Sequence, residues 1–164
     1  QADYEEQFRV TMEVQQTLQE LRSVLKRLRE IREQAREVIS RARAAERDVG
    51  ELPEILETME AAFAVLEADL TSVDDVSVPV FKRPSRGGGL DLEYGALMNN
   101  LNSGGGYVAG STEGRPTIGA TEKKRDLDLA WTQVRSRAEL ALDAQTTAFN
   151  AEASRLGLMG ILIR

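Results

Sequence analysis

The sequence contains no cysteine and no histidine, and each absence excludes a class of functional site. Zinc sites built on thiolate or imidazole, axial haem histidines, cysteine nucleophiles and histidine-dependent triads all need one of these residues. Di-iron bundles of the Glu-x-x-His type are excluded for the same reason. Without cysteine there is neither a disulfide framework nor a set of reduced thiols, so cysteine usage does not indicate whether the compartment is oxidising or reducing.

Aromatic residues and long apolar runs are also scarce. One Trp, three Tyr and four Phe occur in 164 residues, so we expect a core of Leu, Ile, Val and Ala. The longest apolar run, 157–163, is far shorter than the ~20 residues needed to span a bilayer. The sequence starts at Gln1 without a signal peptide, and we expect either a processed chain or part of a longer one. The length favours a single domain, 1–164.

Apolar residues recur every three or four positions over residues 18–49, and this spacing predicts one long helix, about 2–48. The stripe extends back through Val14 and Phe8 to Tyr4. Gly50 ends this helix and Pro53 begins a second one, about 52–73. Because the connection is short, we expect the two helices to form an antiparallel hairpin.

Glycine is concentrated in residues 84–117, which hold nine of the 13 glycines. This composition predicts a long glycine-rich loop that contains one short helix, about 90–101. Thr117 is the expected N-cap of the last long helix, about 117–156, and an apolar tail, 157–164, follows it. The fold class is therefore all-α: an antiparallel bundle of three long helices and one short helix.

Charge is unevenly distributed within a net charge of −6, which argues against general nucleic-acid binding. Residues 22–47 carry nine Arg or Lys against four Glu, whereas residues 51–75 carry eight acidic residues and no basic one. The basic run either binds an anionic partner, such as a membrane surface, or faces the acidic helix that follows it. The adjacency of the two oppositely charged segments favours the second interpretation.

No motif indicates a cofactor, a metal site or catalysis. The run Gly104-Gly-Gly106-Tyr-Val-Ala109 has the spacing of a dinucleotide fingerprint, but no βαβ unit surrounds it. Neither Asp74-Asp75 nor Asp126-Leu-Asp128 has the ligand spacing of a calcium loop. We therefore expect no enzyme activity, no cofactor and no dedicated metal site.

Four short motifs occur in a recognisable order: Leu92-Glu-Tyr94, Leu97-Met-Asn-Asn-Leu101, Tyr107-Val108 and Arg115-Pro-Thr117 before a long helix. This order resembles the C-terminal helical region of bacterial secreted proteins that carry sortilin-like (BNR-type) β-propeller repeats. Residues 3–12 and the pair Phe149-Asn150 before an apolar tail also fit. The propeller itself is missing, so its glycan or peptide recognition does not carry over. The resemblance implies an exported, non-catalytic helical module, periplasmic or secreted, that packs on another protein.

The leading functional hypothesis is an accessory subunit that stabilises a larger membrane-associated assembly, respiratory or photosynthetic. The alternatives are a helical domain of a secreted propeller protein that recognises polysaccharide or peptide, and an anionic-surface binder. The residues expected to contact a partner protein are apolar residues of the glycine-rich loop and the tail. The alternative is that these residues only cap the bundle. They are Leu90, Tyr94, Tyr107, Val108, Leu158, Met159, Ile161 and Ile163.

Overall fold

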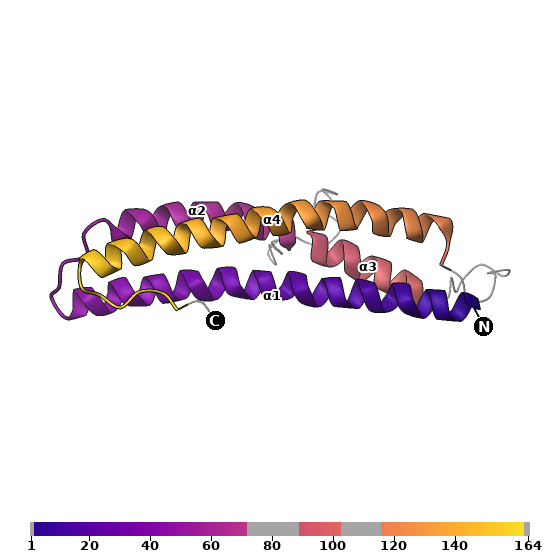
Figure 1. Cartoon of the computed structure of the whole chain (residues 1–164), viewed down its shortest axis with the longest axis horizontal. Coiled ribbons are helices and arrows are strands. Elements are labelled where there is room, and N and C mark those ends of the chain that lie inside the picture. Colours follow the sequence, from indigo (N-terminus) through magenta and orange to yellow (C-terminus); the bar gives the residue numbers. More distant parts are fainter. Residues whose placement is uncertain (1, 72–88, 103–115, 163–164) are drawn as a thin grey trace, which may run out of the picture. The chain divides into compact units, whose positions relative to one another are not determined.

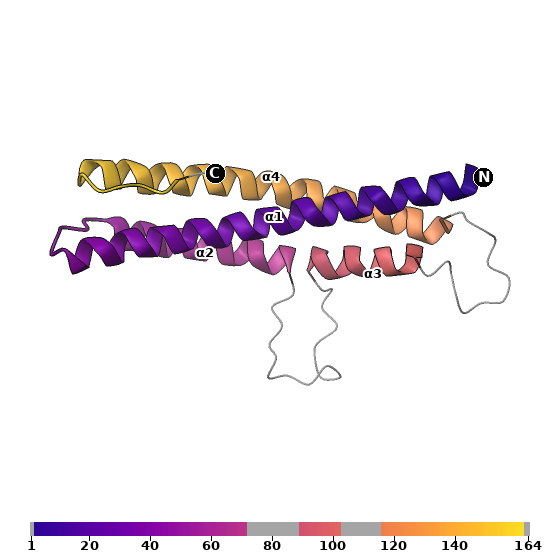
Figure 2. The ribbon, with the colours of Figure 1, turned by 90° about the horizontal axis from the view of Figure 1, so that it is seen from below.

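The computed structural model describes residues 2–71, 89–102 and 116–162. These residues form four helices and no strand, which confirms the all-α prediction (Figures 1 and 2). The helices are α1 (Ala2–Ala44), α2 (Leu52–Leu70), α3 (Leu90–Asn102) and α4 (Ile118–Arg155). The chain divides into two compact units, which we describe separately. Unit 1 comprises Gln1–Arg22 and Ala68–Val134, and unit 2 comprises Ser23–Glu67 and Arg135–Arg164.

The first helix ends at Ala44, four residues before the predicted end. Glu46 adopts a left-handed backbone conformation (φ 52°), and its N–H donates to the carbonyl of Arg43 (3.0 Å). The N–H of Arg47 donates to the carbonyl of Ala42 (2.9 Å). This pair of bonds is a Schellman motif, which normally has glycine at the left-handed position. The sequence pattern missed the end of the helix because a glutamate occupies that position.

The other helix boundaries lie closer to the predictions. α2 ends at Leu70 rather than near residue 73, and α3 extends one residue beyond the predicted 101. α4 begins at Ile118, and the N–H of Ala120 donates to Thr117 Oγ1 (3.2 Å). Thr117 is therefore the N-cap, as predicted. Most of the predicted glycine-rich loop lies outside the described residues.

Unit 1 packs the N-terminal half of α1 against α3 and the first half of α4. α3 runs antiparallel to both long helices here (Figure 1). Its apolar residues at helical spacing, Leu90, Tyr94, Leu97 and Leu101, are all buried and form one face. Gly89 lies so close to the backbone of Thr71 that any Cβ would overlap it. The buried apolar side chains of this unit are Val10, Val14, Leu18, Leu21, Leu70, Leu90, Tyr94, Leu97, Leu101, Ala120, Leu127, Trp131 and Val134.

Unit 2 packs the C-terminal half of α1 against α2 and the second half of α4. α2 runs antiparallel to α1, as the short connection requires, and α4 runs in the same direction as α1 (Figure 1). The core is mainly aliphatic, as expected, with two buried phenylalanines. Its members are Val24, Leu28, Ile31, Ala35, Ile39, Ala42, Leu52, Met59, Phe63, Leu66, Ala138, Leu142, Phe149, Ala153 and Ile161.

The apolar stripe predicted for the first helix is wrong at Phe8 and at Ala45, and Ala45 lies beyond the end of α1 and is exposed. Phe8 is 69% exposed, and Val10 lies in the core instead. At 100° per residue, Phe8 lies about 120° around the helix from Val14, so it cannot share its face. On α4, Ala148 is exposed, whereas Thr146, a polar residue, is buried.

Candidate interaction surface

The tail (157–162) returns along unit 2 after a sharp turn at the end of α4. Gly157 has φ 64°, its N–H donates to the carbonyl of Ser154 (3.0 Å), and the N–H of Leu158 donates to that of Ala153 (2.8 Å). This is a second Schellman motif, here with glycine at the left-handed position. It reverses the chain and directs the tail back beside α1 and α4 (Figures 1 and 2).

A polar clasp holds the start of the tail. Arg47 donates through Nη2 to the carbonyls of Leu156 (3.1 Å) and Gly157 (3.0 Å), so its positive charge faces the negative end of the α4 dipole. Glu152 accepts the N–H of Glu51 (3.1 Å) and pairs with Arg155 (2.5 Å). The hydrogen bonds from Arg155 and then that from Glu51 lower the pKa of Glu152 from 4.5 to about 2.

Asn150, on α4, is hydrogen-bonded to the tail backbone in both directions. Its Oδ1 accepts the N–H of Ile161 (2.6 Å), and its Nδ2 donates to the carbonyl of Ile161 (3.1 Å). On the other side of the tail, Gln34 of α1 accepts the N–H of Leu162 through Oε1 (3.0 Å). Three side-chain hydrogen bonds therefore fix an extended segment two residues long. We call Asn150, Gln34 and the buried position of Ile161 the tail seat.

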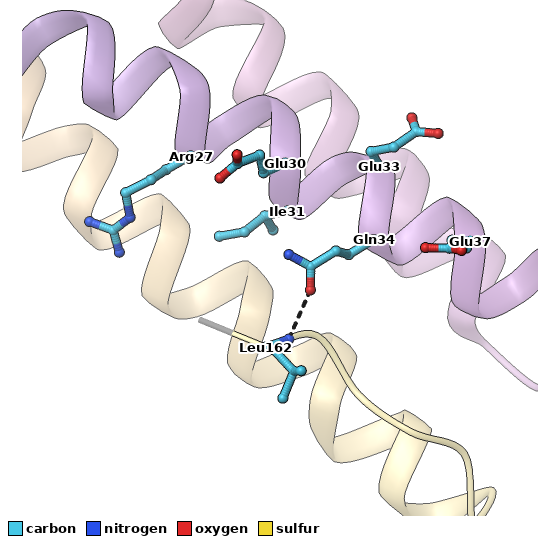
Figure 3. Close-up of a pocket in the computed structure, with 7 residues that line it drawn as sticks. All are labelled: Arg27, Glu30, Ile31, Glu33, Gln34, Glu37 and Leu162. Atoms are coloured by element: carbon cyan, nitrogen blue, oxygen red, sulfur yellow. Dashed lines mark hydrogen bonds between the residues drawn. The ribbon is translucent and has the colours of Figure 1, made fainter. Parts of the chain in front are cut away.

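Two hollows lie beside the tail seat on the α1 side. One, of about 320 Å³, has apolar walls that include Val38, Ala42, Ala45, Leu158 and Met159. The other, of about 380 Å³, lies beyond Leu162 and is shown in Figure 3. Its lining residues are Arg27, Glu30, Ile31, Glu33, Gln34, Glu37 and Leu162. The tail thus covers the surface of α1 only in part.

The structure separates the predicted contact residues into two groups. Leu90 and Tyr94 are buried in the core of unit 1, and Ile161 is buried in unit 2, so all three already have partners within the chain. Leu158 is half-buried and Met159 is 76% exposed, so they offer apolar surface. Tyr107, Val108 and Ile163 lie outside the described residues.

The two polar residues of the tail seat were not predicted from the sequence. Asn150 and Gln34 lie on long helices among many other polar residues, and neither position breaks the helical pattern. The only signal is that Asn150 precedes a Gly-Ile pair by ten residues, in a chain segment that has to reverse direction at Gly157. Such a pairing depends on where the tail packs, which periodicity does not describe.

A second polar network lies in unit 1 and joins its three main helices. The hydroxyl of Tyr94 on α3 donates to Asp128 Oδ1 on α4 (2.8 Å). Lys124 Nζ lies 2.7 Å from Asp128 Oδ2 and 3.1 Å from Glu13 Oε2 on α1. Burial, together with the nearby Asp128 carboxylate, raises the pKa of Tyr94 well above 10. Burial alone would lower the pKa of Lys124, but its two carboxylate partners outweigh that effect and raise it.

The basic run of α1 faces the acidic helix α2 within unit 2, as the adjacency of the two segments favoured. Arg29 and Arg32 lie 3.6 Å and 3.1 Å from Glu67, and Arg36 lies 2.6 Å from Glu60. Lys26 and Arg41 pair instead with glutamates of α1 itself. In these ion pairs, glutamates neutralise several of the basic side chains that an anionic surface would have to bind.

The described residues contain neither a metal-binding cluster nor a membrane-spanning helix. No group of three or more Asp or Glu side chains there is arranged to hold a metal ion. Among the described helices, none has a stretch apolar and long enough to cross a bilayer.

No family model matches the chain, and no curated protein or solved structure is similar to it. The resemblance to the helical region of sortilin-like propeller proteins therefore stays a prediction. The functional argument that follows depends on the surface of the chain itself.

Proposed function

We propose that this chain is a non-catalytic helical scaffold that binds another protein through the tail face of unit 2. The observation that carries the proposal is the exposure of apolar side chains along one short segment. Met159 is 76% exposed and Leu162 is 59% exposed, and both line the hollow of about 320 Å³ beside α1. Contiguous exposed apolar surface of this kind typically marks a protein interface.

The assembly that we propose is an extracytoplasmic one, periplasmic or secreted, in which the chain is an accessory subunit of a membrane-associated complex. The sequence resemblance supports the exported location, and the tail face supplies a surface for a protein partner. A respiratory or photosynthetic complex is the specific form of this hypothesis. The closest rival is a helical domain of a secreted propeller protein.

The test is gentle purification of the tagged chain from its native source, followed by mass spectrometry of the proteins that accompany it. We expect one partner in fixed stoichiometry, and we expect the double variant M159D/L162D to lose that partner, because charge at both positions would be buried in the interface. The matched control is L140D, since Leu140 is also in unit 2 and is 73% exposed. Retention of the partner by M159D/L162D would exclude the tail face, and recovery only within a longer polypeptide would favour the propeller protein.

A further inference from the structure

The N-terminal half of α1 exposes an apolar pair that the core of unit 1 does not use. Phe8 is 69% exposed and Met12 is 48% exposed. The two residues are one helical turn apart, so their side chains lie on the same face of α1, directed away from the buried Val10 and Val14. Adjacent exposed apolar side chains indicate an interaction surface, whereas single exposed ones are ordinary.

This face continues without charge for two further turns. Gln15, Gln16 and Gln19 are all exposed, and with Phe8 and Met12 they line a hollow of about 570 Å³. We call these five residues the α1 strip. A glutamine side chain carries no charge to desolvate, and its amide can both donate and accept a hydrogen bond across an interface. The α1 strip is therefore suited to burial against another helix.

One pair of opposite charges borders the α1 strip. Arg9 Nη1 lies 2.7 Å from Glu13 Oε1, and Lys124 holds the other oxygen of Glu13 at 3.1 Å. A two-fold axis relates residue i of one copy to residue j of the other and j to i. An axis near position 11 therefore brings each Arg9 opposite the Glu13 of a second, antiparallel copy. The four charges then alternate in sign around the axis, so this border is complementary to itself.

The same register brings the apolar side chains of the two copies together. Each Met12 then lies beside Phe8 and Met12 of the second copy, and each Phe8 packs between Met12 and the glutamine stems of Gln15 and Gln16. A parallel arrangement would instead place Arg9 near Arg9 and Glu13 near Glu13. Charge and apolar contact therefore favour one geometry, an antiparallel pair.

We infer that the α1 strip is a homodimer interface, in which α1 of a second copy of this chain packs antiparallel on α1 of the first. The strip extends only about 17 Å at 1.5 Å per residue, which is too short to bury the ~1,200–2,000 Å² of a stable interface. We therefore expect a weak dimer with a Kd on the order of 100 µM, and a monomer at low micromolar concentration. The α1 strip lies in unit 1, so the inference goes beyond the function proposed for the tail face of unit 2.

The first test places a single cysteine on the α1 strip, since the chain has none of its own. Antiparallel pairing brings position 12 of one copy beside position 12 of the other. A short bismaleimide should therefore join two copies of M12C at a chain concentration of about 200 µM. It should not join two copies of Q19C, because the antiparallel register separates these two positions by about 24 Å along the helix axis. A parallel pair would cross-link both variants, and denaturing gel electrophoresis measures the cross-linked fraction.

The second test measures the dimer without cysteine, by sedimentation equilibrium. We expect a reversible monomer–dimer equilibrium for the wild type and a Kd at least about tenfold higher for F8D, which brings a carboxylate into the interface. The variant R9E, which places a carboxylate against Glu13 of the second copy, should raise the Kd at least about threefold. The matched controls L129D and R125E should dimerise like the wild type, because both residues are exposed on α4 of the same unit. Circular dichroism verifies that every variant is folded.

Three results would overturn the inference: a wild type that stays monomeric up to about 1 mM, equal cross-linking of M12C and Q19C, or undiminished dimerisation of F8D. The variant M159D/L162D should dimerise like the wild type, because the tail face is not part of the α1 strip. The two proposals therefore fail separately. Loss of the native partner by M159D/L162D without any wild-type dimer would exclude only the dimer, whereas a dimer without any native partner would exclude only the proposed scaffold function.

Discussion

The two units of this chain use different interactions to hold three helices together. In unit 1 a tyrosine, an aspartate and a lysine form a partly buried network that reaches from α3 to α4 and α1. In unit 2 the core is apolar except for Thr146, and the polar contacts are surface ion pairs and a clasp at the end of the bundle. The network of unit 1 depends on Tyr94 staying protonated, and the pKa of Tyr94 is raised. The clasp of unit 2 depends on Glu152 staying ionised, and the pKa of Glu152 is lowered. The units should therefore respond to pH in opposite directions.

The largest expected effect is on the apolar core of unit 2. Phe63 is completely buried, so the variant F63A should lose about 3–5 kcal/mol of unfolding free energy through lost burial and the cavity left behind. Urea unfolding followed by circular dichroism measures the loss, and hydrogen exchange with mass spectrometry localises it to unit 2 peptides. The control F8A removes an exposed ring and should change stability by no more than about 0.5 kcal/mol.

A smaller loss of unfolding free energy is expected when the hydrogen-bond network of unit 1 is interrupted. The variant Y94F removes the hydrogen bond to Asp128 and should cost about 1–2 kcal/mol near pH 8, since Asp128 keeps partial access to water. Because the folded pKa of Tyr94 is raised, its contribution is complete below pH 10 and is lost as the pH rises further.

The stability difference between wild type and Y94F should therefore narrow above pH 10. The fluorescence of Trp131, the only Trp and a buried residue of unit 1, follows this unfolding directly. A difference that stays constant from pH 8 to pH 11 would contradict the assigned role of the hydroxyl.

Unit 2 should gain stability when its buried polar atom is removed. Thr146 is buried on α4, and its Oγ1 has no hydrogen-bond partner among the described residues. The variant T146V keeps the shape of the side chain and should gain about 1 kcal/mol, because the desolvated hydroxyl disappears. Thermal unfolding compares it with T132V, in which an exposed hydroxyl that donates to the carbonyl of Asp128 (2.8 Å) is lost without gain. Destabilisation by T146V would show that Oγ1 has a partner after all.

The smallest effect on stability is expected at the clasp of unit 2, and it disappears in acid. Because the pKa of Glu152 is lowered to about 2, its contribution is present above pH 4.5 and is lost as the pH falls toward 2. The variant E152Q should therefore be slightly less stable than wild type at pH 6 and equal to it near pH 2. Thermal melts across this pH range measure the difference, and E54Q is the control on the exposed face of α2. A gap between wild type and E152Q that is the same at pH 6 and pH 2 would exclude the ion pair as its source.

The sequence by itself determined the helices and most of their buried faces. The sequence predicted all four helices and the N-cap at Thr117, because these depend on contacts between near neighbours in the chain. It also indicated that the arginines of α1 face the glutamates of α2, since a short connection leaves the two helices little choice.

Only the tertiary structure decided how the polar residues are used. Nothing in the spacing distinguishes Asn150 from other polar residues of α4. Nor does the spacing show that Tyr94 is the centre of a network within the chain and not a contact for a partner. The end of α1 at Ala44 could not be predicted either, because Glu46, a non-glycine residue, holds the left-handed conformation that follows it. Periodicity reports which face of a helix is buried, whereas a hydrogen bond between residues far apart in the chain depends on the packing of that face against another segment.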